Sequence, residues 1–265
     1  NILITGASKG IGLEIGKRLV TAGHTVIGTS RKPQSISDAP FKLLPLEVGS
    51  QESAEAFIES AIAELGHIDV LINNAGYDLY AAAEEAGIQD TAAQLDTNFL
   101  GTVRVTTATL PHMRKRGKGF IINMSSIGGF LGLPYNSAYA ASKFALEGYS
   151  ESLRLELLPF GICVSLVEPQ AVATETLDTS IVGASTPHPT YAKRSAELIG
   201  RMREMGRNSP VSTHTVAEKV VQIVASSKPK LRYPVGNQSR YVPYMKQLLP
   251  QRLFERFMVA QFVNN

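Results

Sequence analysis

The stretch that decides the fold is Ile2-Leu3-Ile4-Thr5-Gly6-Ala7-Ser8-Lys9-Gly10-Ile11-Gly12, near the start of the sequence. A short apolar run typical of a strand leads into a turn with three glycines, and apolar residues at helical spacing follow. Glycines at such a turn let backbone N–H groups approach a pyrophosphate, while the helix N-terminus supplies partial positive charge. The alternative is a tight turn without a ligand. We predict a phosphate-binding loop formed by Gly6, Ser8, Lys9, Gly10, Ile11 and Gly12.

The strand-then-helix pattern of this first unit recurs along the chain. Predicted strands occupy residues 2–5, 25–29, 41–46, 68–72, 119–124, 162–167 and 231–235. Predicted helices occupy residues 11–22, 51–65, 91–116, 138–158 and 213–227. This alternation predicts an α/β fold, a Rossmann-like, doubly wound, parallel seven-stranded sheet with helices on both faces. We expect a single domain over residues 1–265, with a substrate lid at 174–210 and a C-terminal extension at 236–265.

Composition excludes several classes of function. The chain has 265 residues, with 26 Lys+Arg against 23 Asp+Glu, so a net charge of +3 argues against a nucleic-acid binder. The single cysteine, Cys163, excludes an internal disulfide and a multi-cysteine metal centre, and the five histidines show no metal-ligand spacing, so we expect no metal. No apolar run approaches the roughly 18–20 residues that cross a bilayer. We expect a cytoplasmic protein with no transmembrane segment.

The turn after the second predicted strand bears on the choice of nucleotide. An NAD site would place Asp or Glu there for the ribose 2′-hydroxyl, but this chain has Thr29-Ser30-Arg31-Lys32. Ser30 can hydrogen-bond a 2′-phosphate and Arg31 can pair with it in a bidentate manner. The alternative is a solvated basic turn. We predict NADP(H) as the cofactor.

A second group of residues suits acid–base chemistry. Tyr139 and Lys143 are four residues apart in a predicted helix and so share one face. A neighbouring ammonium favours the phenolate form of a tyrosine and lowers its pKa. Ser126 follows a predicted strand and is well placed to polarise a carbonyl, and Asn98 lies within a predicted helix, where asparagine is unfavourable unless it has a specific role. Taken singly, each of these residues is also compatible with an ordinary turn or surface position.

Together these motifs resemble the short-chain dehydrogenase/reductase family over nearly the whole chain. The matching motifs, in the family's order and spacing, are TGASKGIG at 5–12, NNAG at 73–76, Ser126, Tyr139 with Lys143, and Pro169-x-x-Val172-Ala173-Thr174. The stretch at 125–157, SSIGGFLGLPYNSAYAASKFALEGYSESLRLEL, most resembles the branch that holds 17β-hydroxysteroid and retinol dehydrogenases.

The resemblance implies a role for each matching residue. Tyr139 would be the general acid/base, Ser126 would hold the carbonyl oxygen, Lys143 would bind the nicotinamide ribose and tune Tyr139, and Asn98 would hold a relay water. Hydride would pass directly between nicotinamide and substrate, with no metal. The remaining residues implied to line the cofactor are Glu47, Val48, Asn74, Ala75, Gly76, Pro169, Val172 and Thr174. The helices at 91–116 and 138–158 would pair subunits into a homodimer or homotetramer.

One departure from the family pattern concerns the nicotinamide side. Gln170 follows Pro169 where the family usually has glycine, and we expect its side chain to contact the substrate or the carboxamide. Leu133 and Tyr135 lie in an apolar loop between Ser126 and Tyr139, and we assign them to the substrate pocket. We predict an NADP(H)-dependent alcohol dehydrogenase/carbonyl reductase acting on a neutral, bulky, apolar small molecule. The alternatives are a catalytically idle NADP(H) sensor or partner protein and a nucleotide-sugar epimerase.

Overall fold

The computed structural model describes residues 1–33, 39–174 and 181–262. Its main sheet has seven strands in the order β3-β2-β1-β4-β6-β7-β9, and every neighbouring pair is parallel. The strands are β1 (Ile2–Ile4), β2 (Val26–Ser30), β3 (Lys42–Pro45), β4 (Val70–Asn73), β6 (Gly119–Met124), β7 (Ile162–Pro169) and β9 (Arg232–Val235). The predicted doubly wound sheet is confirmed, with all seven predicted strands in place.

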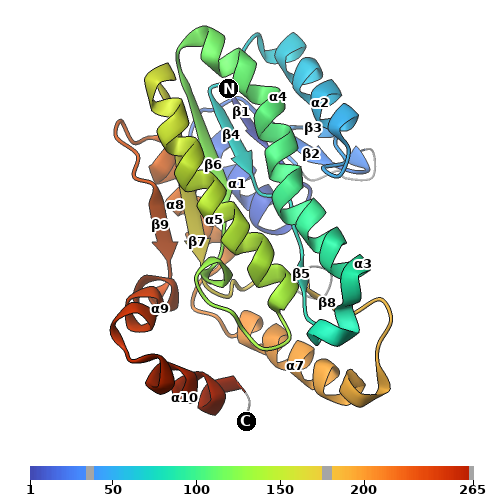
Figure 1. Ribbon diagram of the computed structural model, residues 1–265. Coiled ribbons are helices and arrows are strands. Elements are labelled where there is room, and N and C mark those ends of the chain that lie inside the picture. The colour runs from blue at the N-terminus through green and yellow to red at the C-terminus, as the bar shows by residue number, and fades with distance from the viewer. Residues whose placement is uncertain (34–38, 175–180, 263–265) are drawn as a thin grey trace.

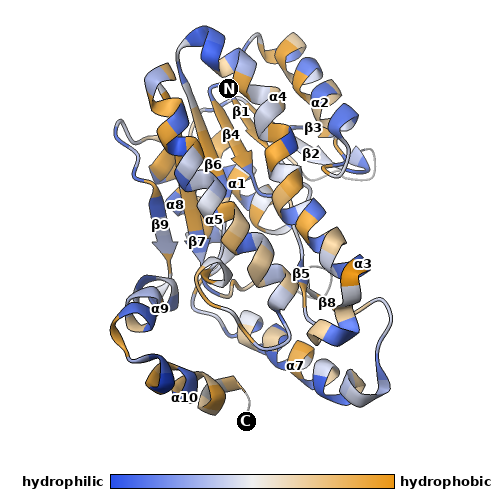
Figure 2. Ribbon diagram, viewed as in Figure 1, coloured by the Kyte–Doolittle hydropathy of each residue, from blue (hydrophilic) through white to orange (hydrophobic). Residues whose placement is uncertain are grey.

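Helices cover both faces of this sheet (Figure 1). On one face lie α1 (Gly10–Thr21) and α8 (Thr213–Val224), and on the other lie α2 (Gln51–Leu65), α4 (Gly101–Arg116) and α5 (Ser137–Leu157). The strands are apolar on both sides because each side packs against helices. Ile2 and Ile4 belong to the core cluster with α1 and α8, whereas Leu3 belongs to the cluster on the opposite face. Figure 2 shows the same pattern as apolar strands between amphipathic helices.

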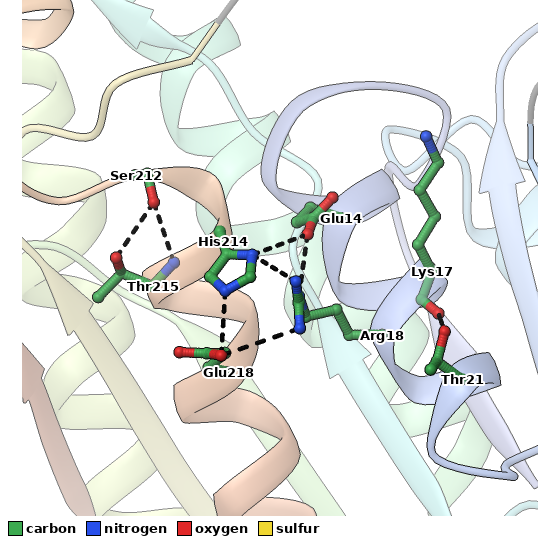
Figure 3. Close-up of polar contacts among 8 residues, drawn as sticks. All are labelled: Glu14, Lys17, Arg18, Thr21, Ser212, His214, Thr215 and Glu218. Carbon is green, nitrogen blue, oxygen red and sulfur yellow. Dashed lines mark hydrogen bonds and ion pairs between the residues drawn. The ribbon is translucent and has the colours of Figure 1, made fainter.

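The packing of α8 against α1 fixes the helix that starts at the glycine-rich turn. Buried Ile15 and Leu19 of α1 share a core cluster with Val216 and Val220 of α8. Outside this apolar contact, Glu14, Arg18, His214 and Glu218 form a network of ion pairs and hydrogen bonds between the two helices (Figure 3). The Ser212 side chain caps α8 by accepting from the backbone N–H of Thr215, at 3.2 Å.

Several elements extend beyond the alternating core. A small parallel sheet pairs β5 (Asp78–Leu79) with β8 (Ile181–Val182), and α7 (Pro189–Arg207) follows β8 within the predicted lid segment. The short helices η3 (Ile127–Gly129) and η4 (Leu158–Phe160) precede α5 and β7. After β9 come α9 (Asn237–Leu248) and α10 (Gln251–Phe262). Residues 175–180 of the predicted lid lie outside the described residues.

The predicted helix at 91–116 is helical throughout but is not a single α-helix. It consists of the end of α3 (Ala83–Leu95), a π-helical turn η2 (Asp96–Leu100) and α4. Single π-turns inside helices are frequent at functional sites. Within the described ranges, no helix is long and apolar enough to cross a membrane, and no three His, Cys, Asp or Glu side chains gather as metal ligands would.

Candidate active site

The glycine-rich turn between β1 and α1 has the geometry of a phosphate cradle. Gly6 and Gly10 have positive φ values of 64° and 57°, which glycine adopts without strain. A Cβ atom on Gly12 would lie 2.3 Å from the Gly6 carbonyl oxygen, so only glycine permits this close turn. Lys9 is the N-cap residue of α1 and its side chain makes no cap hydrogen bond. The first turn of the helix therefore keeps amide groups for an anion.

The loop after β4 is fastened to this turn. Asn74 Nδ2 donates to the carbonyl oxygens of Thr5 and Gly6, both at 3.0 Å. The Thr5 hydroxyl accepts in return from the backbone N–H groups of Asn74 and Ala75, at 2.9 and 3.0 Å. The structure thus brings the TGASKGIG and NNAG motifs together at the carboxyl ends of β1 and β4.

The predicted adenosine-side residues lie at the next strands along the same edge. Thr29 anchors the end of β2 to the cradle, because its hydroxyl accepts from the Gly6 N–H at 3.0 Å. Ser30 ends β2 and Arg31, directly after it, is exposed. Past the end of β3, Glu47 is exposed and Val48 is buried against α4, where a Cβ on Gly101 would lie 2.9 Å from the Val48 Cβ.

Tyr139, Lys143 and Ser126 come together beside η3. A Cβ atom on Gly128 would lie 2.8 Å from Tyr139 Cε1 and 3.6 Å from Ser126 Oγ, so this glycine makes room for both side chains. Lys143 is only 8% exposed, its Nζ donates to the Met124 carbonyl oxygen at 2.8 Å, and Nζ lies 5.7 Å from the centre of the Tyr139 ring. One turn of α5 therefore presents the phenol and the ammonium together, as their spacing predicts.

Burial dominates the electrostatics of this pair. Burial and then the negative charge of Asp78 raise the pKa of Tyr139 well above its usual range, and a hydrogen bond with Ser126 acts in the opposite direction. Burial lowers the pKa of Lys143 to about 8, although Asp78 and Glu147 favour its charged form. The phenol is therefore held protonated, which is the form that donates a proton to a carbonyl oxygen.

Asn98 lies in the π-helical turn, and its amide is engaged with protein atoms. Its Oδ1 accepts from the Tyr77 N–H at 3.1 Å, and its Nδ2 donates to the Tyr77 carbonyl at 2.9 Å and to Ser142 Oγ at 3.3 Å. A Cβ on Gly76 would lie 3.0 Å from the Asn98 Oδ1. The side chain thus positions the chain that follows NNAG, and its role in a water relay stays a prediction.

The predicted substrate residues lie in two places: Gln170 lies next to α9, and Leu133 and Tyr135 lie in the loop before α5. Gln170 is buried, and its Oε1 accepts from the Gln238 N–H at 3.0 Å, so the side chain reaches the first turn of α9. Of the two other residues, Tyr135 has a φ of 59°, uncommon outside glycine, and it packs with Tyr80 and the α7 cluster. Leu133 is partly buried in the same loop, its carbonyl accepting from the N–H of Asn136 at 3.2 Å.

The remaining residues predicted to line the cofactor lie at the end of β7 and directly after it. Pro169 is its last residue, and Val172 is buried in the core cluster that includes α1 and α8. Thr174 is the last described residue before the gap at 175–180.

Two polar residues of the site escaped the sequence analysis. They are Asp78 and Asn136. Asp78 lies on β5, and its Oδ1 accepts a hydrogen bond from Asn136 Nδ2 at 2.8 Å. Asn136 is 1% exposed, and its Nδ2 also donates to the Leu79 carbonyl oxygen at 3.0 Å. Burial raises the pKa of Asp78 to about 7. The available signal was an acidic residue inside an otherwise apolar and aromatic run, Tyr77-Asp78-Leu79-Tyr80, directly after NNAG.

A match to a known family agrees with this arrangement. The family model described as short chain dehydrogenase matches residues 1–181. The chain belongs to the short-chain dehydrogenase family. It is therefore placed among oxidoreductases, as its motifs predict.

The relatives include the predicted branch. A 3-ketodihydrosphingosine reductase of Bacteroides thetaiotaomicron is 41% identical over 239 residues, which cover 89% of this chain and 87% of that protein. Retinol dehydrogenase 8 of Bos taurus is 35% identical (91% and 82% covered), and human 17-beta-hydroxysteroid dehydrogenase type 1 is 32% identical (98% and 84% covered). The similarity to retinol and 17β-hydroxysteroid dehydrogenases is confirmed.

Solved structures support the fold. A short-chain dehydrogenase from Streptomyces avermitilis superposes with a TM-score of 0.81 at 32% identity, covering 98% of this chain and 96% of that chain. ElxO, solved with NADP bound, superposes with a TM-score of 0.73 at 26% identity, covering 91% of this chain and 98% of its own.

Proposed function

We propose that this short-chain dehydrogenase is an NADP(H)-dependent alcohol dehydrogenase/carbonyl reductase. The observation that carries the proposal is the placement of Tyr139, Lys143 and Ser126 at the same sheet edge as the glycine cradle. NADP(H) fits the cradle because glycine alone permits its close turns, and Arg31 at the end of β2 suits a 2′-phosphate. The relative with NADP bound, ElxO, supports the same choice.

Ser126, Tyr139 and Lys143 each have a different role in the proposed carbonyl reduction. Ser126 hydrogen-bonds the carbonyl oxygen and holds it beside Tyr139, whose raised pKa keeps the proton on the phenol until it is needed. Lys143, fixed by the Met124 carbonyl, stabilises the phenolate that remains after the proton leaves. The bound nicotinamide supplies the hydride. In alcohol oxidation each proton moves in the reverse direction.

We propose that the substrate is an alcohol or ketone whose bulk is apolar and that α7 closes over it. Tyr80, Tyr135, Leu198 and Met202 form one apolar cluster between the catalytic loops and α7. Glu85 ties α7 to α3, because it accepts from Ser195 Oγ at 2.7 Å and from the His188 N–H at 3.2 Å. Retinol and 17β-hydroxysteroid dehydrogenases among the relatives support a bulky apolar substrate.

A ketone panel with NADPH tests the proposal. Steroid and retinoid carbonyls, aromatic ketones, 3-ketodihydrosphingosine and a homologous series of alkyl ketones would be assayed by loss of NADPH absorbance. Each buried CH₂ contributes about 0.8 kcal/mol, so kcat/KM should rise several-fold per methylene until the pocket fills. NADPH binding without turnover of any member would instead identify an idle sensor.

The Tyr139→Phe variant tests the assigned acid. It should bind NADPH nearly normally and lose turnover by about 10² or more, because acid–base catalysis typically contributes about 10²–10⁴. The control is the NADPH dissociation constant, measured by fluorescence on the same preparation. Retention of more than about a third of wild-type turnover would exclude Tyr139 as the general acid.

A further inference from the structure

Asp78 is a carboxylate held rigidly at the reacting end of the site. Its strand, β5, packs against α5, the helix that carries Tyr139 and Lys143. The backbone on both sides is fixed by buried amides: Asn98 bonds the N–H and carbonyl of Tyr77, and Gln94 accepts from the Leu79 N–H at 2.9 Å. Such fixed placement is what a group needs if it is to bind a substrate in one orientation.

Among the described residues, the Asp78 carboxylate has a hydrogen-bond donor but no ion-pair partner. Asn136 donates to Oδ1, but among the described residues no lysine or arginine forms an ion pair with Asp78. The charge of Lys143 acts on Asp78 from a distance, yet its Nζ is bonded to the Met124 carbonyl. Asp78 is half-buried as a residue, and burial is the largest cause of the raised pKa of its carboxyl group. A partly desolvated carboxylate without a cation is costly unless a ligand completes it.

The charge of Asp78 also opposes the chemistry beside it. It raises the pKa of Tyr139, which makes the phenolate formed during proton donation less favourable. A cation bound at Asp78 would cancel that opposition and would favour ionised Asp78, whose pKa burial has raised to about 7. A positively charged substrate would therefore bind more tightly to Asp78 and would also make proton donation by Tyr139 more favourable.

We infer that Asp78 binds a protonated amino group of the substrate, carried near the carbonyl group that Tyr139 and Ser126 contact. The substrate class is an amino ketone, or the corresponding amino alcohol, with an apolar chain that lies against the cluster of Tyr80, Tyr135, Leu198 and Met202. This inference rests on the proposed carbonyl reduction and replaces the expectation of a wholly neutral substrate. Asp78 is a specificity residue and takes no part in hydride or proton transfer.

The experiment compares Asp78→Asn with the wild type on matched substrates. The variant keeps the Oδ1 acceptor for Asn136 and removes only the charge. Three long-chain ketones would be assayed with NADPH: one with a free amino group beside the carbonyl, its N-acetyl derivative, and the ketone without nitrogen. Glu64→Gln, which removes an exposed charge paired with Lys42, is the control variant. Circular dichroism checks that both variants fold.

Because a hydrogen bond to a charged group is strong, we expect the amino group to change kcat/KM by about tenfold or more. The wild type and Glu64→Gln should prefer the free amine over both neutral ketones by that factor. Asp78→Asn should lose this preference and reduce all three ketones with similar kcat/KM, whatever its absolute rate. A long-chain alkylamine without a carbonyl should inhibit the wild type and inhibit Asp78→Asn about tenfold less, which reports binding even if the variant turns over poorly.

Other outcomes separate this inference from the proposed function. Reduction of all three ketones without preference for the amine, or an equal loss on all three in Asp78→Asn, overturns the role of Asp78 and leaves carbonyl reduction standing. Failure of the wild type to reduce any ketone overturns both.

Discussion

At the scale of single residues, the protonation state of Lys143 makes the charge of the site depend on pH. Burial lowers its pKa to about 8, while the negative charges of Asp78 and Glu147 favour the ammonium and act in the opposite direction. Glu147 lies one turn further along α5 and accepts from Ser125 Oγ. Asp78 and Glu147 are therefore part of the electrostatics of Lys143.

Arg31 is expected to set the preference between the two nicotinamide nucleotides. The guanidinium lies exposed at the end of β2, where it can pair with a 2′-phosphate that NADH lacks. Arg31→Ala should shift the ratio of kcat/KM for NADPH over NADH by roughly tenfold toward NADH, since a charged hydrogen bond contributes about 1.5–3 kcal/mol before exposure reduces it. Steady-state kinetics with both nucleotides measure the ratio. An unchanged ratio would refute the assignment.

Glu168 links stability to pH. Glu168 is buried, Arg232 Nη1 lies 2.9 Å from its Oε1, and the same Arg232 also pairs with Glu147. Burial, and then repulsion from Glu147, raises the pKa of Glu168 from its usual 4.5 to about 7. Between these values the folded protein retains a proton that the unfolded chain releases. The free energy of unfolding therefore decreases as pH rises from 4.5 to 7.

Glu168→Gln should reduce that dependence, because glutamine does not titrate. Each unit of pKa shift corresponds to about 1.4 kcal/mol, so the wild type should lose about 1–3 kcal/mol more than the variant on going from about pH 5 to about pH 7.5. Urea unfolding at a series of pH values measures both slopes. Parallel slopes for the two proteins would show that Glu168 is ionised throughout this range.

At the scale of elements, the π-helical turn shows what sequence reasoning captured and what it missed. Asparagine is unfavourable in a helix interior, and that observation alone singled out Asn98. The structure adds that its amide holds the backbone of Tyr77 and so positions β5, a partner that lies 21 residues away in sequence. Periodicity predicts elements, but it does not show which loop a buried amide will bind.

The same limit explains which contacts around the predicted substrate pocket the sequence could not show. The seven strands and the pairing of Tyr139 with Lys143 on one face of α5 depend on local apolar patterns and helical spacing, so the sequence predicts them. The β5–β8 sheet joins two-residue strands about a hundred residues apart, too short to show any period. The expected contact of Gln170 with the substrate or the carboxamide stays a prediction; its hydrogen bond to the Gln238 N–H of α9, 68 residues further along the chain, has no local signal in the sequence.

Substitutions at the α1–α8 contact can compare the stability that comes from apolar burial with the stability that comes from surface ion pairs. Ile223 of α8 is 1% exposed in the core cluster, and Ile223→Ala should lower the free energy of unfolding by about 2–5 kcal/mol. Arg18 lies at the surface of the same contact, and Arg18→Met should cost less than about 1 kcal/mol, because exposed ion pairs contribute little. Chemical denaturation of both variants gives the comparison. A larger effect for Arg18→Met would mean that the polar network in Figure 3 holds α8 in place.

At the scale of the whole molecule, the outer side of α5 exposes apolar side chains, although Lys246 Nζ of α9 lies 5.2 Å from the ring centre of one of them, Phe144. Phe144 is 42% exposed and Leu155 is 69% exposed, and their spacing of eleven residues puts them on one stripe of the helix. In Figure 1 this helix lies beside α4 on the outside of the sheet. A symmetric dimer can bury such a stripe against its own copy. The exposure of α5 thus agrees with the expected pairing of subunits through these helices.

We therefore expect a homodimer or homotetramer in light scattering at micromolar concentration, and a 28.6 kDa monomer for Leu155→Glu. A charge placed in a paired apolar stripe faces its own copy across the two-fold axis, so each interface carries the penalty of two unpaired charges. Leu248→Glu is the comparison variant, because Leu248 is 82% exposed on α9, a C-terminal helix whose Lys246 Nζ lies 5.2 Å from the ring centre of Phe144 on α5. Dissociation by Leu248→Glu but not by Leu155→Glu would move the interface to the C-terminal helices, and a monomeric wild type would exclude pairing through α5 altogether.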